Sequence, residues 1–169
     1  MLHGLVLLPA AILAQGTAQN PDCQAIARQF AAVYLDRRSR LEGAYRRTTG
    51  WFSDRLVQLI AGYQRRRDRD MKAEPDDEPM PEIEEEIAVF WDRPSAVKVQ
   101  PVQESGASAT VALLCSWGKG TQYPGDQVQM TLCFIRTAKG WRLDDIRTAA
   151  GKFVDRQTLS EELGKYQPE

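Results

Sequence analysis

The feature that most constrains the fold is a run of strand-like segments between residues 107 and 147. Within residues 128–135, apolar and polar side chains alternate, so that one face carries Val128, Met130, Leu132 and Phe134. A period of two is typical of a strand that buries one face against a core. The Lys139-Gly140 turn then leads into a strand that begins at Trp141. Two strands joined by so short a turn predict an antiparallel hairpin.

Two earlier segments extend this hairpin into an antiparallel sheet of about four strands. Residues 109–117 are apolar at nearly every position, which predicts a central strand covered on both faces. Residues 96–102 alternate, and Pro101 favours an edge position because proline has no N–H to donate to a neighbouring strand.

Helical spacing precedes the sheet. Ile26, Phe30 and Tyr34 recur at this spacing after Pro21, which predicts a first helix through about residue 41. A second helix begins at Ser53 as its N-cap and extends beyond Tyr63. Residues 64–70 are polar on all sides, so that end of the helix either protrudes or frays. A short C-terminal helix carries Leu159, Leu163 and Tyr166. The predicted class is α+β, with N-terminal helices packed on a curved antiparallel sheet.

The first 18 residues have the pattern of a secretory signal peptide. Residues 5–14 are apolar, and small residues that suit cleavage follow at Ala14, Gly16 and Ala18. Ten apolar residues are too few to cross a bilayer, which takes about twenty. We therefore expect a signal peptide over 1–18 and one domain over 19–169. A periplasmic or secreted location follows, with no integral membrane segment after cleavage.

Charge is spread unevenly along a chain whose net charge is only −1, a balance that does not favour a nucleic-acid partner. Residues 74–92 hold nine acidic residues and no basic one, whereas residues 19–73 hold twelve basic residues against six acidic ones. Three prolines interrupt the acidic block, which predicts a mobile loop over 74–86. The apolar residues between positions 83 and 91 return the chain to the core, and a short helical turn is one way for them to do so. Such blocks are either solvated faces or a docking surface. The partner-binding candidates are Asp76, Asp77, Glu78, Glu84, Glu85 and Glu86.

Three cysteines are present, and two of them lie on consecutive predicted strands. In an oxidising compartment, Cys115 and Cys133 would form a disulfide if the strand register places them opposite each other. A pairing with Cys23 stays open, and without export all three would be buried free thiols. The sequence has no CxxC motif and no Cys/His spacing, so we expect no metal site and no cofactor.

Four short segments resemble the nuclear transport factor 2-like (cystatin-like) superfamily and, more narrowly, a family of exported bacterial domains of unknown function within it. They are Phe30-Ala31-Ala32-Val33-Tyr34-Leu35, Trp51-Phe52-Ser53-Asp54-Arg55-Leu56, Ala109-Thr110-Val111 and Trp141-Arg142-Leu143-Asp144-Asp145-Ile146. The resemblance implies a helix-backed curved sheet that forms a cone around a central cavity. The superfamily includes isomerases, dehydratases, scaffolds, ligand binders and immunity proteins, so the fold alone does not select a function.

The leading hypothesis for function is an exported, non-enzymatic binding module. The chain's one histidine, His3, lies in the predicted signal peptide, which removes the commonest general base from the mature domain. Such a module would recognise a protein partner or a small apolar ligand, for example as an inhibitor or immunity protein in the cell envelope.

Two other hypotheses stay open. A cone-pocket isomerase or dehydratase would use Asp145, which shares strand parity with Trp141 and so faces inward, with Tyr34 or Tyr63 as a proton donor. Against it, Asp145 can instead bond a neighbouring loop or helix, or pair with a nearby arginine. The third hypothesis is a structural homodimer through an open face of the sheet.

Overall fold

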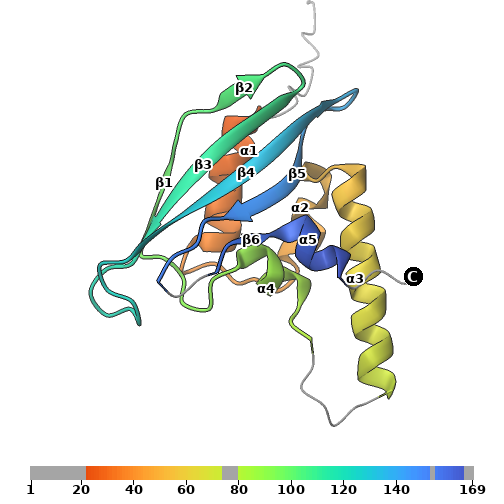
Figure 1. Ribbon diagram of the computed structural model, residues 1–169, viewed down its shortest axis with the longest axis horizontal. Helices are drawn as coiled ribbons and strands as arrows, with labels where there is room; N and C mark the ends of the chain where they lie inside the picture. Colours follow the sequence, from red (N-terminus) through yellow and green to blue (C-terminus); the bar gives the residue numbers. More distant parts are fainter. Residues whose placement is uncertain (1–21, 74–79, 153–154, 166–169) are drawn as a thin grey trace, which may run out of the picture.

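A computed structural model describes residues 22–73, 80–152 and 155–165 (Figure 1). These residues form an α+β fold in which helices pack against an open, antiparallel, six-stranded sheet. The predicted signal peptide over 1–18, the loop residues 74–79 and Tyr166 lie outside the described residues. Across the described ranges, no helix combines the length and the apolar character that crossing a membrane requires.

The sheet follows the order β1-β3-β4-β5-β6, and β2 also pairs with β3. Its strands are β1 (Ala96–Val99), β2 (Gln103–Ser105), β3 (Ser108–Ser116), β4 (Gln127–Thr137), β5 (Gly140–Thr148) and β6 (Gln157–Thr158). The short strands β2 and β6 account for the difference from the four expected. Pro101 falls between β1 and β2, so the first edge is interrupted where proline lacks a donor. The Gln24 side chain bridges this gap by bonding the Gln100 carbonyl and the Val102 N–H.

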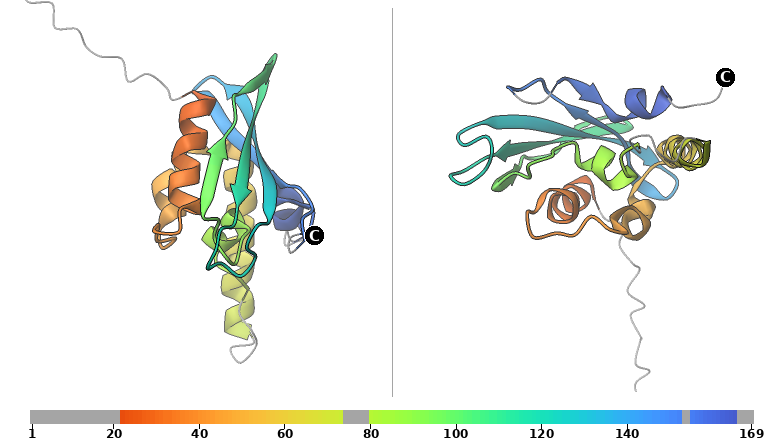
Figure 2. Two further views of the ribbon diagram at one scale, coloured as in Figure 1. Left: turned by 90° about the vertical axis from the view of Figure 1, so that its left-hand side faces the viewer. Right: turned by 90° about the horizontal axis from the view of Figure 1, so that it is seen from below.

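The helices gather on both sides of the sheet (Figure 2). They are α1 (Cys23–Phe30), the π-helical turn η1 (Ala31–Leu35), α2 (Ala44–Thr48), the 3-10 turn η2 (Thr49–Trp51), α3 (Asp54–Ala73), α4 (Ile83–Ala88) and α5 (Leu159–Gly164). The two views agree that α1 and α5 lie on opposite sides of the sheet, and α3 stands beside the β5 edge. The predicted first helix therefore ends at η1, several residues before position 41.

The core lies between α1, α3 and the inner face of the sheet. Alternate residues of β4 are buried there, as predicted: Val128, Met130, Leu132 and Phe134. The expectation that β3 is covered on both faces is wrong, because its burial alternates between buried and half-buried positions. Thr110, Ala112 and Leu114 form part of an outer face that is only partly covered.

Helix α3 has a capped N-terminus and a polar C-terminal half. The Ser53 hydroxyl accepts the Leu56 N–H at 3.1 Å, which confirms Ser53 as the N-cap. The polar part beyond Tyr63 does not fray, because the helix continues to Ala73 and protrudes from the sheet (Figure 1). Arg66 and Asp70 stabilise this end through an i,i+4 pair at 2.9 Å.

The acidic block is not a loop throughout. Glu84, Glu85 and Glu86 belong to helix α4, which corrects the predicted loop over 74–86. The helix forms because Ile83 and Ile87 bury one side of a single turn, while the Glu85 side chain accepts the Glu82 N–H at 3.1 Å. Acidic residues in a first helical turn are also favoured by the helix dipole. The acidic block contacts the arginine-rich end of α3, since Arg67 pairs with Glu82 at 3.3 Å.

Candidate functional site

The paired aspartates near the end of β5 lie at a β-bulge, which changes the direction of their side chains. Phe134 pairs with Leu143, but the preceding residue, Cys133, pairs with Asp145. Asp144 is therefore the extra residue in β5, and strand parity is reversed beyond it. Ile146 then takes the inner face, and Asp145 takes the outer one. The inward direction expected for Asp145 is wrong because the bulge cannot be read from alternation alone.

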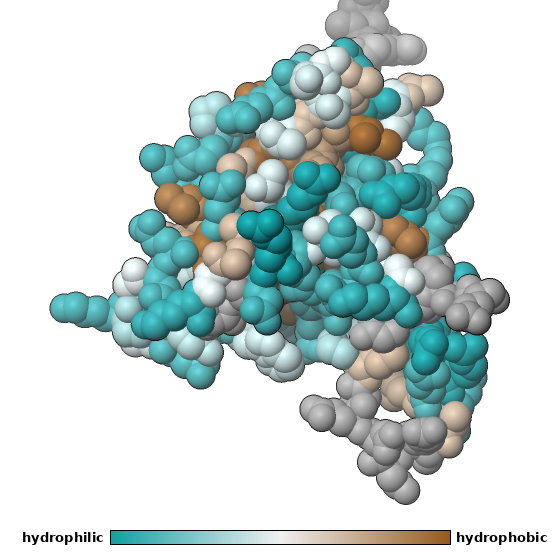
Figure 3. Space-filling model, viewed as in Figure 1, coloured by the Kyte–Doolittle hydropathy of each residue, from teal (hydrophilic) through white to brown (hydrophobic). Residues whose placement is uncertain are grey.

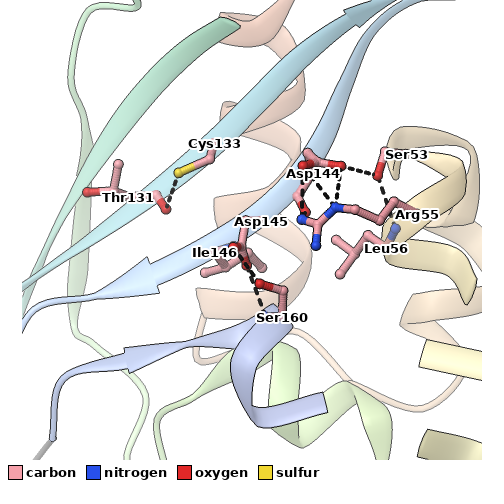
Figure 4. A network of polar contacts seen from close by, with 9 residues as sticks. All are labelled: Ser53, Arg55, Leu56, Thr131, Cys133, Asp144, Asp145, Ile146 and Ser160. Atoms are coloured by element: carbon pink, nitrogen blue, oxygen red, sulfur yellow. Dashed lines mark hydrogen bonds and ion pairs between the residues drawn. The ribbon is translucent and has the colours of Figure 1, made fainter. Parts of the chain in front are cut away.

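Asp144 ties β5 to the start of α3 (Figure 4). Its carboxylate accepts the Ser53 hydroxyl at 2.5 Å and the Arg55 guanidinium at 2.9 Å. Burial alone would raise the pKa of Asp144, but the hydrogen bonds from Arg55 and Ser53 outweigh it and lower that pKa. The Arg55 side chain is 49% exposed, so this ion pair is screened by solvent. Its geometry fits a structural connection.

Asp145 binds the start of helix α5. One carboxylate oxygen accepts the N–H groups of Ile146 and Ser160, at 2.9 and 3.0 Å, and the other accepts the Ser160 hydroxyl at 2.7 Å. The residue is buried, and its partners come from β5 and α5 (Figure 4). Asp145 thus fixes α5 on the outer side of the sheet, as a strand aspartate bonded to a neighbouring helix.

The structure does not bring the two candidate tyrosines to Asp145. The Tyr34 hydroxyl is bonded to Thr48 Oγ1 at 2.6 Å, and burial raises the pKa of Tyr34. The Tyr63 hydroxyl donates to the Pro81 carbonyl at 2.8 Å and to Glu86 at 3.3 Å. These hydroxyls face the inner side of the sheet or α4, whereas Asp145 faces α5, so the Asp/Tyr pair of the isomerase hypothesis is not assembled.

The cysteines do not meet either. Cys115 pairs with Val128 across β3 and β4, whereas Cys133 pairs with Thr110, five positions away along β3. An odd separation also puts the two side chains on opposite faces. The register therefore contradicts the predicted disulfide, and Cys23, Cys115 and Cys133 are free thiols. Burial raises the pKa of Cys115 to about 12 and that of Cys23 to about 11.

The outer face of the sheet carries small apolar areas between polar side chains (Figure 3). Ala112, Leu114 and Ile135 are half-buried there. Among the described residues, the large apolar side chains classed as exposed are Met71 and Trp91, and neither belongs to a strand.

Trp91 is the side chain that stands apart, because it is 95% exposed. Val89 ends α4 in the left-handed region at φ 63°, which is strained for a β-branched residue. Phe90 then turns inward and packs edge-on against Trp117, with the centroids of the two rings 5.1 Å apart. The Trp117 indole N–H donates to the Asp92 carbonyl at 2.6 Å. Trp91 is therefore held outward by a turn that is anchored on both sides.

A pocket of about 270 Å³ lies beside Trp91. Its lining combines apolar side chains with a few charged ones: Leu41, Pro81, Ala88, Val89, Phe90, Trp91, Glu85, Glu86, Arg93 and Gln157. Concave, mostly apolar sites with a few polar groups are typical of ligand and partner pockets. Of the predicted partner-binding residues, Glu85 and Glu86 line this pocket. Glu84 instead accepts the Tyr45 N–H of α2 at 3.4 Å. Asp76, Asp77 and Glu78 lie outside the described residues.

Glu86 is the electrostatically unusual group of this pocket. Burial raises its pKa, and the nearby charges of Glu162 and Glu85 raise it further, against the hydrogen bond from Tyr63. Arg93, on the other side, donates from one nitrogen to the carbonyls of Asp36 and Ser39, at 2.9 and 2.7 Å. A carboxylate with a raised pKa in a pocket is a functional-site signal.

A larger groove of about 470 Å³ runs between η1 and β1. None of the described residues that line it is aromatic, and two of its three charged residues pair with each other, since Arg38 bonds Asp36 at 3.3 Å. We therefore regard the Trp91 pocket as the better candidate site. In the described part of the chain, no group of three or more His, Cys, Asp or Glu side chains is arranged to hold a metal ion.

The sequence did not single out Trp91. The segment Val89-Phe90-Trp91 was interpreted as a return to the core, which holds for Phe90 but not for Trp91. A tryptophan next to an aspartate at the end of a strongly acidic block was the available signal. Comparison with protein-family models, with curated proteins and with solved structures found no match for this chain.

Proposed function

We propose that this protein is a non-enzymatic binding module that recognises a protein partner through the Trp91 pocket. The observation that carries the proposal is the 95% exposure of Trp91 on an anchored turn beside a pocket. Exposing an indole to water sacrifices apolar burial, and tryptophan is among the residues that dominate binding energy at protein interfaces.

The turn favours binding in a second way. Val89 at φ 63° carries strain that its neighbours must offset, and strained backbone clusters at functional positions. Phe90 and Asp92 fix the backbone on either side of Trp91. An anchor that is already ordered loses little conformational entropy when a partner binds.

The setting of this module is also a proposal. The signal-peptide pattern of residues 1–18 supports a periplasmic or secreted location. The order of helices before a hairpin-rich antiparallel sheet supports a nuclear transport factor 2-like, cone-shaped domain. Within that setting, an inhibitor or immunity role in the cell envelope fits a small domain whose docking surface is a preformed pocket.

Site-specific photo-crosslinking tests the proposal. The full chain would carry a photoreactive phenylalanine analogue at position 91 in one form and at position 139 in a matched control. Lys139 lies in the exposed turn between β4 and β5, on another part of the surface. We expect one discrete protein adduct in host cells at position 91 and none at position 139. Identical adducts at both positions, or none at position 91, would overturn the proposed docking surface.

A further inference from the structure

We propose that the Trp91 pocket receives an arginine side chain of the partner protein, with the guanidinium stacked on Trp91 and paired with Glu85 and Glu86. The inference rests on the proposed function and specifies the chemistry of its partner. It is carried by the aromatic side chain, the volume of the pocket and the charges that line it.

Trp91 provides the stacking surface. Tryptophan is the best aromatic partner for a cation, and a guanidinium is planar, so that it stacks as well as attracts. Most of the Trp91 indole is open to solvent, whereas the neighbouring Phe90 ring packs against Trp117 in the core. The apolar lining of Leu41, Ala88 and Val89 suits the three methylene groups of an arginine stem.

The carboxylates provide the charge complement. Glu85 is exposed at the start of α4, where one oxygen of its carboxylate accepts the Glu82 N–H at 3.1 Å. Glu86 accepts a hydrogen bond from Tyr63 of α3, and it is close enough to feel the charges of Glu85 of its own helix, Glu162 of α5 and Lys165, which follows α5. Two carboxylates, Glu85 and Glu86, therefore line one end of the pocket, and Glu162 adds its negative charge near Glu86. A bound cation would relieve their repulsion.

The cations already near the pocket are engaged within the protein. Lys165 pairs with Glu162 at 2.6 Å. Arg93 is directed to the backbone carbonyls of Asp36 and Ser39, and the Asp36 charge offsets part of its own. The charge offered to a ligand at the α4 side of the pocket is therefore negative, which favours arginine over an acidic or neutral side chain.

The test is a titration of the full chain, labelled with ¹⁵N at its tryptophan indoles, with two blocked tripeptides. One is Gly-Arg-Gly, and the other replaces arginine by citrulline, which keeps the shape and removes the charge. The W91F variant identifies the Trp91 indole resonance. We expect a saturable shift of that resonance with the arginine peptide, at least about tenfold weaker binding of the citrulline peptide, and no shift of Trp117.

Conservative variants complete the experiment. E85Q and E86Q each keep the helix but remove a charge, and the double variant should weaken arginine binding by about tenfold. E104Q, on exposed β2, is the matched control and should change nothing. Equal binding of both peptides would overturn the arginine inference. The arginine inference would also be overturned if the Trp91 resonance does not shift at about 50 mM arginine peptide while position 91 still crosslinks a partner. With no shift and no adduct, the proposed function falls as well.

Discussion

Replacing Asp145 with alanine removes the acceptor of three hydrogen bonds at the junction of β5 and α5. The Ile146 N–H stays buried, and an unsatisfied buried donor costs about 1–3 kcal/mol. Losing the carboxylate at the start of α5 adds about 1 kcal/mol, as at other helix N-termini. We therefore expect D145A to lower the free energy of unfolding by about 3 kcal/mol, a large part of the stability of a domain of this size.

Urea unfolding, followed by the fluorescence of the buried residues Trp117 and Trp141, measures this loss. S160A keeps the backbone N–H bond to Asp145 and should cost only about 1 kcal/mol. D145N retains an acceptor oxygen and should fall between wild type and D145A. If D145A unfolds within about 0.5 kcal/mol of wild type, the reasoning that Asp145 fixes α5 is refuted.

Three further predictions follow from the polar groups. D144A and R55A should each cost about 1 kcal/mol, with a coupling energy in a double-mutant cycle that falls as salt is added; a coupling that salt leaves unchanged would contradict a screened pair. Because the pKa of Glu86 is raised in the folded state, its carboxylate opposes folding at neutral pH, and stability falls as pH rises above the ordinary glutamate value of 4.5. E86Q should therefore be more stable than wild type at pH 7 and equal to it below pH 4.5 in urea unfolding, and a destabilised E86Q at pH 7 would be inconsistent with this sign. Cys115 and Cys133 should show no mass change on reduction, and Cys115 should react with a thiol reagent only after unfolding; a gain of the mass of two hydrogens on reduction would show that a disulfide is present after all.

The fold was predictable where the apolar pattern was regular. The alternation in β4, the turn before Trp141 and the cap at Ser53 all depend on neighbouring residues, and the structure confirms them. A short helical turn near residue 83 was one of the expectations, but the loop was predicted to run to residue 86 because three prolines and a run of acidic residues resemble a loop. Helix α4 depends on Ile83 and Ile87 finding a buried surface, which is a tertiary effect.

The candidate site was less predictable than the fold. A one-residue bulge at Asp144 reversed the parity that was used to direct Asp145 inward, and bulges leave no periodic signal. The disulfide failed for a similar reason, since the register that pairs Cys115 with Val128 cannot be derived from the alternation within either strand. Trp91 followed two residues that do return to the core, and only the left-handed backbone at Val89 turns it outward.

The central claim is that Trp91 is placed for a partner and contributes little to folding. The free energy of unfolding of W91A tests it most directly, measured in urea against wild type. An indole that is 95% exposed has almost no packing to lose, so we predict a change within about 0.5 kcal/mol. A loss of about 2 kcal/mol or more would show that the ring packs against the protein in solution, and would contradict the account.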